Sequence, residues 1–238
     1  MPEENEGDAG DGVIWGVDLK GARLRDVDLT GARLQNVWLI DVEAEALVDR
    51  FVINGVDVTD YVNERDPWHR SRSAQRAATP EEMREGWAAI EAEWAKAVER
   101  ARALPGDALH QQVDGEWSFV QTLRHLVFAV DKWFTAPVLG EAFHPMGMPN
   151  SGSVDFPWPG LDPALSPSFA EALAVHEDRA ARVRDYLASV DPGDLEREVE
   201  VLENGANPVR HCVQVVFEEE FWHLRYAVRD MARLEADA

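Results

Sequence analysis

The sequence predicts a mainly α-helical protein: a four-helix bundle that follows a short segment built on a five-residue repeat. Two observations carry this prediction. Four stretches of about 18–26 residues place apolar side chains at helical spacing and are bounded by helix-capping residues. Ahead of them, leucine recurs every five residues, a period that fits neither the 3.6 residues of a helical turn nor the alternation of a flat strand.

The composition indicates which partners to exclude. The chain has 238 residues and a formal net charge of −22, so we expect neither nucleic-acid binding through phosphates nor docking on anionic membranes. Cys212 is the only cysteine, which rules out an internal disulfide and fits a reducing compartment. Residues 1–12 are acidic and polar, so we predict a disordered tail without signal-peptide features. No apolar run is long enough to cross a membrane, and we expect a cytoplasmic protein.

The repeat occupies residues 17–41 and reads VDLKG, ARLRD, VDLTG, ARLQN, VWLID. A period of five fits a chain that turns one side of a square per repeat, with its leucines inward: Leu19, Leu24, Leu29, Leu34 and Leu39. The segment resembles the pentapeptide-repeat family, which implies a right-handed square β-helix, and we assign residues 13–62 to it. Five repeats make little more than one coil and cannot bury their own core, so we expect a homodimer, with the bundle as the alternative cover.

The remaining elements follow in order. An Asn54-Gly55 turn predicts a short hairpin within residues 51–62, and residues 63–79 are expected to be a polar, Arg-rich linker to a bundle over residues 80–238. Thr79-Pro80-Glu81-Glu82 is typical of a helix start. The helices are expected from residue 80 to Pro105-Gly106, about Ser118 to Ala136, about Ser168 to Val190, and 209–234. Residues 137–167 form a long loop that could act as a lid, and residues 193–208 a small hairpin.

The last predicted helix places a carboxylate and a histidine inside its apolar stripe. Glu219 and His223 lie one turn apart and point the same way. A buried carboxylate is costly unless it is paired, hydrogen-bonded or bound to metal. Three interpretations remain open at this point: a Glu–His hydrogen bond in the core, a metal site, and metal-free acid–base chemistry. Glu220, near the edge of the stripe, is the alternative carboxylate ligand, whereas Glu218 points the opposite way.

A phrase in the second predicted helix supplies a third candidate ligand. Residues 116–134, EWSFVQTLRHLVFAVDKWF, combine a Trp-Ser helix start with Leu-x-His-Leu. This resembles the DinB/YfiT-like superfamily, in which that histidine is a metal ligand and the fourth helix adds two more, commonly as His-x-x-x-His. The resemblance implies His125, Glu219 and His223 as ligands, with Glu219 standing where histidine is common. His125 lies off the main apolar stripe, which by itself would indicate a surface or cavity-lining histidine.

His176, on the apolar face of the third helix, is the secondary candidate. It could be a fourth ligand, a hydrogen-bond donor to a ligand, or a core histidine with a main-chain partner.

Two histidines and a carboxylate suit zinc, nickel, iron or manganese and leave coordination positions open. The resemblance therefore implies a metal-dependent enzyme that acts on a small molecule: a transferase or isomerase that uses a low-molecular-weight thiol such as mycothiol, or a hydrolase, with Glu219 as a catalytic base. The alternative is a non-catalytic metal-binding or stress-response protein whose repeat segment docks a partner.

Overall fold

The computed structural model describes residues 14–25, 27–105, 107–150, 158, 160–162 and 164–236. The chain divides into two compact units, with the boundary between Glu45 and Ala46. The tail predicted to be disordered, residues 1–12, lies outside the described residues.

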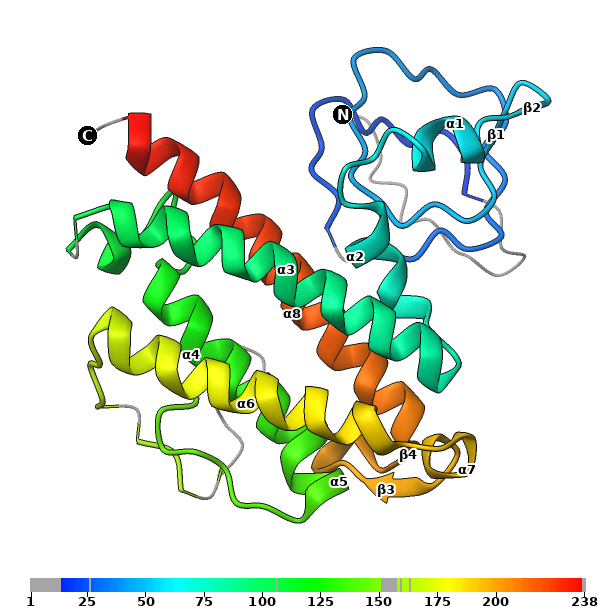
Figure 1. Ribbon diagram of the computed structural model, residues 1–238. Helices are drawn as coiled ribbons and strands as arrows, with labels where there is room; N and C mark the ends of the chain where they lie inside the picture. The colour runs from blue at the N-terminus through cyan, green and yellow to red at the C-terminus, as the bar shows by residue number, and fades with distance from the viewer. Residues whose placement is uncertain are drawn as a thin grey trace. The chain divides into compact units, whose positions relative to one another are not determined.

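The first unit turns a corner at five of its described residues, which are spaced by five or ten positions. The left-handed backbone recurs at Gly16, Gly21, Gly31, Asn36 and Asp41, with φ between 54° and 75°, a conformation that glycine, asparagine and aspartate adopt most readily. Figure 1 draws this segment as an open winding without helix or strand. The structure therefore shows the predicted corner in each described repeat. The expected inward packing of leucine is not seen, because all five repeat leucines are 53–60% exposed.

The second unit begins with the predicted hairpin. Strands β1 (Val52–Ile53) and β2 (Val56–Asp57) pair antiparallel around Asn54 and Gly55, which both have positive φ. This is the geometry that an Asn-Gly turn favours.

Residues 63–79, expected to be a linker, contain the last residue of α1 (Thr59–Asn63), the whole of α2 (His69–Ser73) and a 3-10 turn, η1 (Ala74–Arg76). Arg72 is buried, with Nε 2.9 Å from an Asp66 oxygen and its guanidinium 4.9 Å from the Phe221 ring centre. An arginine that is paired with a carboxylate and stacked on a ring can be buried. The polar, Arg-rich composition of the segment does not predict this burial.

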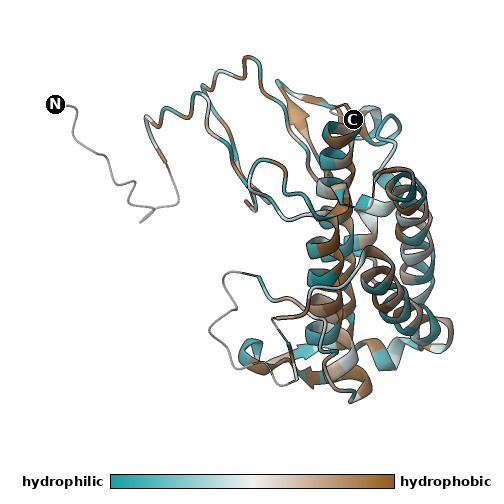
Figure 2. Cartoon of the chain, turned by 90° about the vertical axis from the view of Figure 1, so that its left-hand side faces the viewer, coloured by the Kyte–Doolittle hydropathy of each residue, from teal (hydrophilic) through white to brown (hydrophobic). Residues whose placement is uncertain are grey.

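Four long helices make up most of this unit: α3 (Pro80–Ala103), α4 (Phe119–Val130), α6 (Phe169–Ser189) and α8 (Val209–Ala236). Three of them begin with reciprocal capping boxes, formed by Thr79 with Glu82, Ser118 with Gln121, and Ser168 with Glu171. These ranges confirm the four predicted helices. One core of buried apolar residues draws on all four, and Figure 2 shows their hydrophobic and hydrophilic faces.

The helical path continues beyond α4, further than predicted. A π-helical turn, η3 (Asp131–Thr135), leads into α5 (Ala136–Leu139), which contains Pro137 and is followed by Gly140 as its C-cap. The fully buried Asp131 carboxylate accepts hydrogen bonds from Thr135 Oγ1 at 2.5 Å, Arg179 Nε at 2.7 Å and the His144 main-chain N–H at 2.7 Å. The Asp131 side chain therefore connects α6 and the loop that follows α5 to the helical segment that continues α4.

The connections are short elements. They are η2 (Ala108–His110), α7 (Pro192–Leu195), η4 (Leu202–Asn204), and strands β3 (Glu198–Glu200) and β4 (Ala206–Pro208), which pair antiparallel as the second predicted hairpin. Within the described residues, none of the helices has the length and apolar character to span a bilayer.

Candidate metal centre

His125 from α4 and Glu219 and His223 from α8 converge on one point. One ligand atom from each lies within 4.8 Å of the other two. Both imidazoles approach the same carboxylate oxygen: Glu219 Oε2 is 3.2 Å from His125 Nε2 and 3.3 Å from His223 Nδ1. The packing of α4 on α8 thus brings together residues that are 94 positions apart in the sequence.

The main chain orients both imidazoles. His125 Nδ1 lies 3.1 Å from the Met148 carbonyl oxygen, and His223 Nδ1 lies 2.9 Å from the Glu219 carbonyl oxygen one turn earlier. A ring nitrogen that donates to a carbonyl carries the proton. In a metal-bound form each Nδ1 would keep its proton and each Nε2 would offer its lone pair to the ion, in place of the present hydrogen bond between His125 Nε2 and Glu219.

Charge and burial favour the protonation states that a metal site needs. Burial, the largest influence, raises the pKa of Glu219, but the hydrogen bond from His125 and the charge of His223 outweigh it, so the pKa lies below its usual value. Burial lowers the pKa of His223, and the neighbouring charge of His125 lowers it further. An anionic carboxylate beside a neutral imidazole is the form that binds a divalent cation.

Aromatic rings surround the two imidazoles. The Trp117 ring centre is 4.5 Å from that of His125 and 5.9 Å from that of His223, to which it is nearly parallel. The ring centre of Tyr226, on α8 like His223, is 6.0 Å from that of His223. The His125 side chain is only 3% exposed, whereas those of His223 and Glu219 are 18% and 27% exposed. Solvent therefore reaches the site from the α8 side.

Arg124 holds the loop that follows α5 against this site, a role that sequence reasoning missed. Its Nε donates to the Met146 carbonyl at 3.0 Å and its Nη1 to the Leu165 carbonyl at 2.7 Å, while the Met148 N–H donates to the Arg124 carbonyl at 3.0 Å. The same Met148 supplies the acceptor for His125. The one available signal was an arginine beside a candidate ligand in an otherwise apolar helix.

The loop lies so close to α4 that a side chain at Gly147 would crowd it. A Cβ there would lie 3.0 Å from Leu161 Cδ2 and 3.3 Å from Phe128 Cβ. We call the segment 144–148 the strap.

The secondary candidates, His176 and Glu220, bind each other instead of joining the triad. His176 Nε2 lies 3.1 Å from both carboxylate oxygens of Glu220, and the two residues are 4% and 1% exposed. Burial lowers the pKa of His176, but the charge of Glu220 outweighs it, so the pKa is raised. Glu220 was placed at the edge of the stripe by its helical angle; in the structure it faces α6. Both residues line a groove of about 420 Å³ that includes side chains from α3 and α6.

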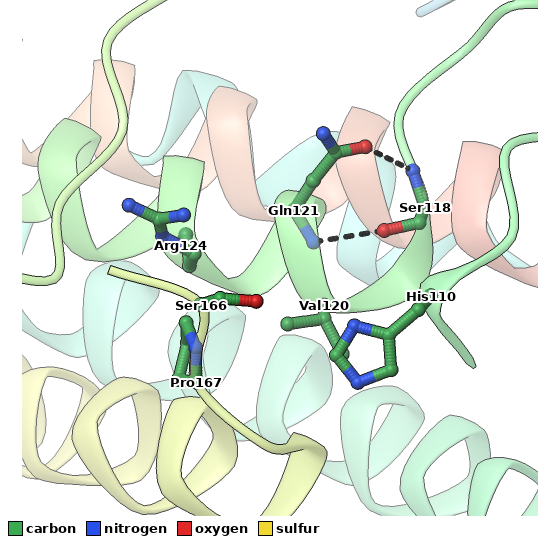
Figure 3. Close-up of a pocket in the computed structure, with 7 residues that line it drawn as sticks. All are labelled: His110, Ser118, Val120, Gln121, Arg124, Ser166 and Pro167. Carbon is green, nitrogen blue, oxygen red and sulfur yellow. Dashed lines mark hydrogen bonds between the residues drawn. The ribbon is translucent and has the colours of Figure 1, made fainter. Parts of the chain in front are cut away.

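Another hollow, of about 150 Å³, lies at the start of α4 (Figure 3). It contains the Ser118–Gln121 cap and no member of the triad. Arg124 lines it too, but two of its nitrogens are already bound to the carbonyls described above. Cys212 is fully buried, and burial raises the pKa of its thiol to about 11, so it is not a thiolate at neutral pH.

Comparisons with known families place both units. A model described as pentapeptide repeats (8 copies) matches residues 14–42. A model described as the DinB superfamily matches residues 89–227, more than half of the chain, and this stretch includes all three members of the triad. No curated protein and no solved structure matches the sequence. On the evidence of that match, with the Trp-Ser and Leu-x-His-Leu phrase inside it, the chain belongs to the DinB superfamily.

Proposed function

We propose that this protein is a metal-dependent enzyme that holds a divalent metal through His125, Glu219 and His223 and joins a low-molecular-weight thiol to an electrophilic small molecule. The observation that supports it is the convergence of two imidazoles and one carboxylate within 4.8 Å. We further infer that the four long helices form the bundle expected of the superfamily.

The three side chains fit a metal by their chemistry. Two nitrogen donors and one oxygen donor suit zinc, nickel, iron or manganese. The Met148 and Glu219 carbonyls fix the imidazoles, as the hydrogen-bond partners of metal-binding histidines commonly do. The spread of 4.8 Å is slightly wider than the roughly 4 Å expected for an empty site of this kind.

The donor set favours catalysis over metal storage. Within the described residues, no fourth histidine, cysteine or carboxylate joins the three in one cluster. Structural zinc sites have four protein ligands, whereas catalytic sites keep a position for water or substrate. The partial exposure of Glu219 and His223 gives a small molecule access to that position.

The reaction would be a substitution at carbon. A bound metal would supply Lewis-acid activation that lowers the pKa of the thiol. The thiol loses its proton to solvent, the sulfur forms a bond to the electrophilic carbon, and the leaving group departs with its bonding electrons. The lowered pKa of Glu219 makes it a better anionic ligand than a general base. Trp117 covers the imidazoles and limits the directions from which a substrate can approach.

The test begins with metal binding. Protein stripped with chelator is titrated separately with zinc, nickel, ferrous iron and manganese by calorimetry, and the bound metal is counted by elemental analysis. We expect one ion per chain, and loss of binding in His125→Ala and His223→Ala. The exposed His211→Ala is the control that should bind as the unchanged protein does. Equal binding by the triad variants would refute the site.

The second stage tests the chemistry. The loaded protein is incubated with chlorodinitrobenzene and either mycothiol or cysteine, and thioether formation is followed. Metal-dependent conjugation supports the proposal. Hydrolysis of an activated ester without thiol would assign the same site to a hydrolase, and stoichiometric metal with no turnover in either assay would favour the metal-binding alternative.

A further inference from the structure

The repeat unit exposes many large apolar side chains within one short segment. Every repeat leucine is more than half exposed, and so are other large side chains of the same short segment: Ile14, Trp15, Val17, Val27, Trp38, Ile40 and Val42. Exposed large apolar side chains gathered in one segment are typical of an interaction site.

The repeat geometry explains why the segment cannot cover itself. With one corner per five residues, the matched residues 14–42 make little more than one four-sided coil. In a stack of repeats the apolar side chains of one coil are covered by the next coil. Here the next coil is missing, because the leucine period fades after Leu39 and the chain continues into the hairpin β1–β2.

The long helices offer little apolar surface to take its place. In the second unit, the exposed large apolar residues gather in the short segment 51–62, and elsewhere among the described residues they are Leu165 and Leu202. Most of the other large apolar side chains of α3, α4, α6 and α8 belong to the shared core or pack against it. A second repeat segment matches the exposed leucines better than this polar surface does.

Charge points to a second copy of the same chain. The protein as a whole carries −22, so most of its surface repels another copy. Residues 17–41 are neutral by comparison: their four basic residues balance four acidic ones, namely Lys20, Arg23, Arg25 and Arg33 against Asp18, Asp26, Asp28 and Asp41. This segment is therefore a part of the protein where two copies can meet without strong repulsion.

We propose that the chain forms a homodimer in which residues 14–42 of two copies stack coil on coil, so that each covers the exposed leucines of the other. This interface is separate from the metal centre and does not depend on the proposed chemistry.

The test uses the full chain in analytical ultracentrifugation from about 1 to 50 µM. We expect a mass near twice the 26.7 kDa of one chain. Two charged double variants, Leu24→Glu with Leu34→Glu and Leu24→Lys with Leu34→Lys, should each be monomeric, with the helical circular dichroism unchanged. Their equimolar mixture should form a one-to-one heterodimer by native mass spectrometry, because opposite charges replace the apolar contact.

The control is Leu165→Glu with Leu202→Glu, which changes exposed leucines outside the repeat and should leave the dimer intact. A monomeric unchanged protein at all concentrations would refute the proposal and favour the protein's own helical unit as the cover. A dimer that survives both repeat variants, or a mixture that does not associate, would also count against it.

Discussion

Two neighbouring glutamates on α8 have opposite environments. Glu219 contacts His125 and His223 in a partly exposed site against α4, whereas Glu220 contacts His176 in a more deeply buried pair against α6. Consecutive helical residues point about 100° apart, so one residue faces each neighbouring helix. Both carboxylates are paired with imidazole, but Glu219 remains within reach of solvent and has two imidazoles on one oxygen. The comparison shows that a buried Glu–His pair is not by itself evidence for a metal site; a second imidazole and access distinguish the candidate centre.

The largest expected effect is on stability, at the buried pair of Glu220 and His176. Glu220→Ala removes the partner of a buried imidazole, and we expect unfolding in urea to become easier by about 3 kcal/mol, at the lower end for a broken buried pair because His176 can release its proton. The exposed Glu218→Ala should change stability by less than about 0.5 kcal/mol. Metal affinity should be the same in both variants. A large loss of metal affinity in Glu220→Ala would mean that the wrong carboxylate has been assigned to the metal.

At the open site the effect should be on metal affinity. Glu219→Gln keeps the shape of the side chain but removes its charge, and we expect metal affinity to fall by about 10- to 100-fold or more. Without metal, stability should fall by about 1 kcal/mol, because the two imidazoles no longer face an ionised carboxylate. Melts of the variant with and without chelator measure both quantities. If the variant loses the same amount of stability with and without chelator, Glu219 is a hydrogen-bond partner in the core and not a metal ligand.

The strap should affect metal affinity, although none of its residues is proposed as a ligand. Arg124→Gln weakens the hold on Met146 and Leu165, and through Met148 the orientation of His125, so we expect metal affinity to fall by about tenfold. Arg182→Gln, in an exposed ion-pair network on α6, is the matched control and should leave affinity unchanged. The nitrogen chemical shifts of His125 in the metal-free protein should change in the first variant alone. Unchanged shifts would show that the strap does not set the tautomer.

The smallest effect should be on the pH dependence of stability, where His223 and His176 should contribute slopes of opposite sign. The lowered pKa of His223 means that stability falls as pH drops below about 6.5, where the unfolded chain takes up a proton first. The raised pKa of His176 contributes stability that is present below about 6.5 and is lost as pH rises through its folded value. The free energy of unfolding is measured in urea at several pH values with chelator present. His223→Gln should reduce its fall toward acid pH, and His176→Gln should reduce its fall toward alkaline pH. The same change of slope in both would contradict the assignment.

The sequence alone determined the local features of this protein. Thr79, Ser118 and Ser168 begin their helices through caps that need only the next three residues. Gly21, Gly31 and Asn36 turn the repeat because few other residues adopt a left-handed backbone easily. The spacing of Glu219 and His223 put them on one face, and the Leu-x-His-Leu phrase identified His125.

The tertiary structure decided what depends on residues far apart in the chain. The partner of Glu220 lies 44 positions away, and the acceptor for His125 is a main-chain carbonyl in a loop that no side-chain pattern reveals. Arg72 is buried in a segment whose composition indicated a linker, and Asp131 organises a π-helical turn through Arg179, 48 residues later. Local propensity is set by a few neighbouring residues, whereas the pairing of buried charges is set by which helices pack together.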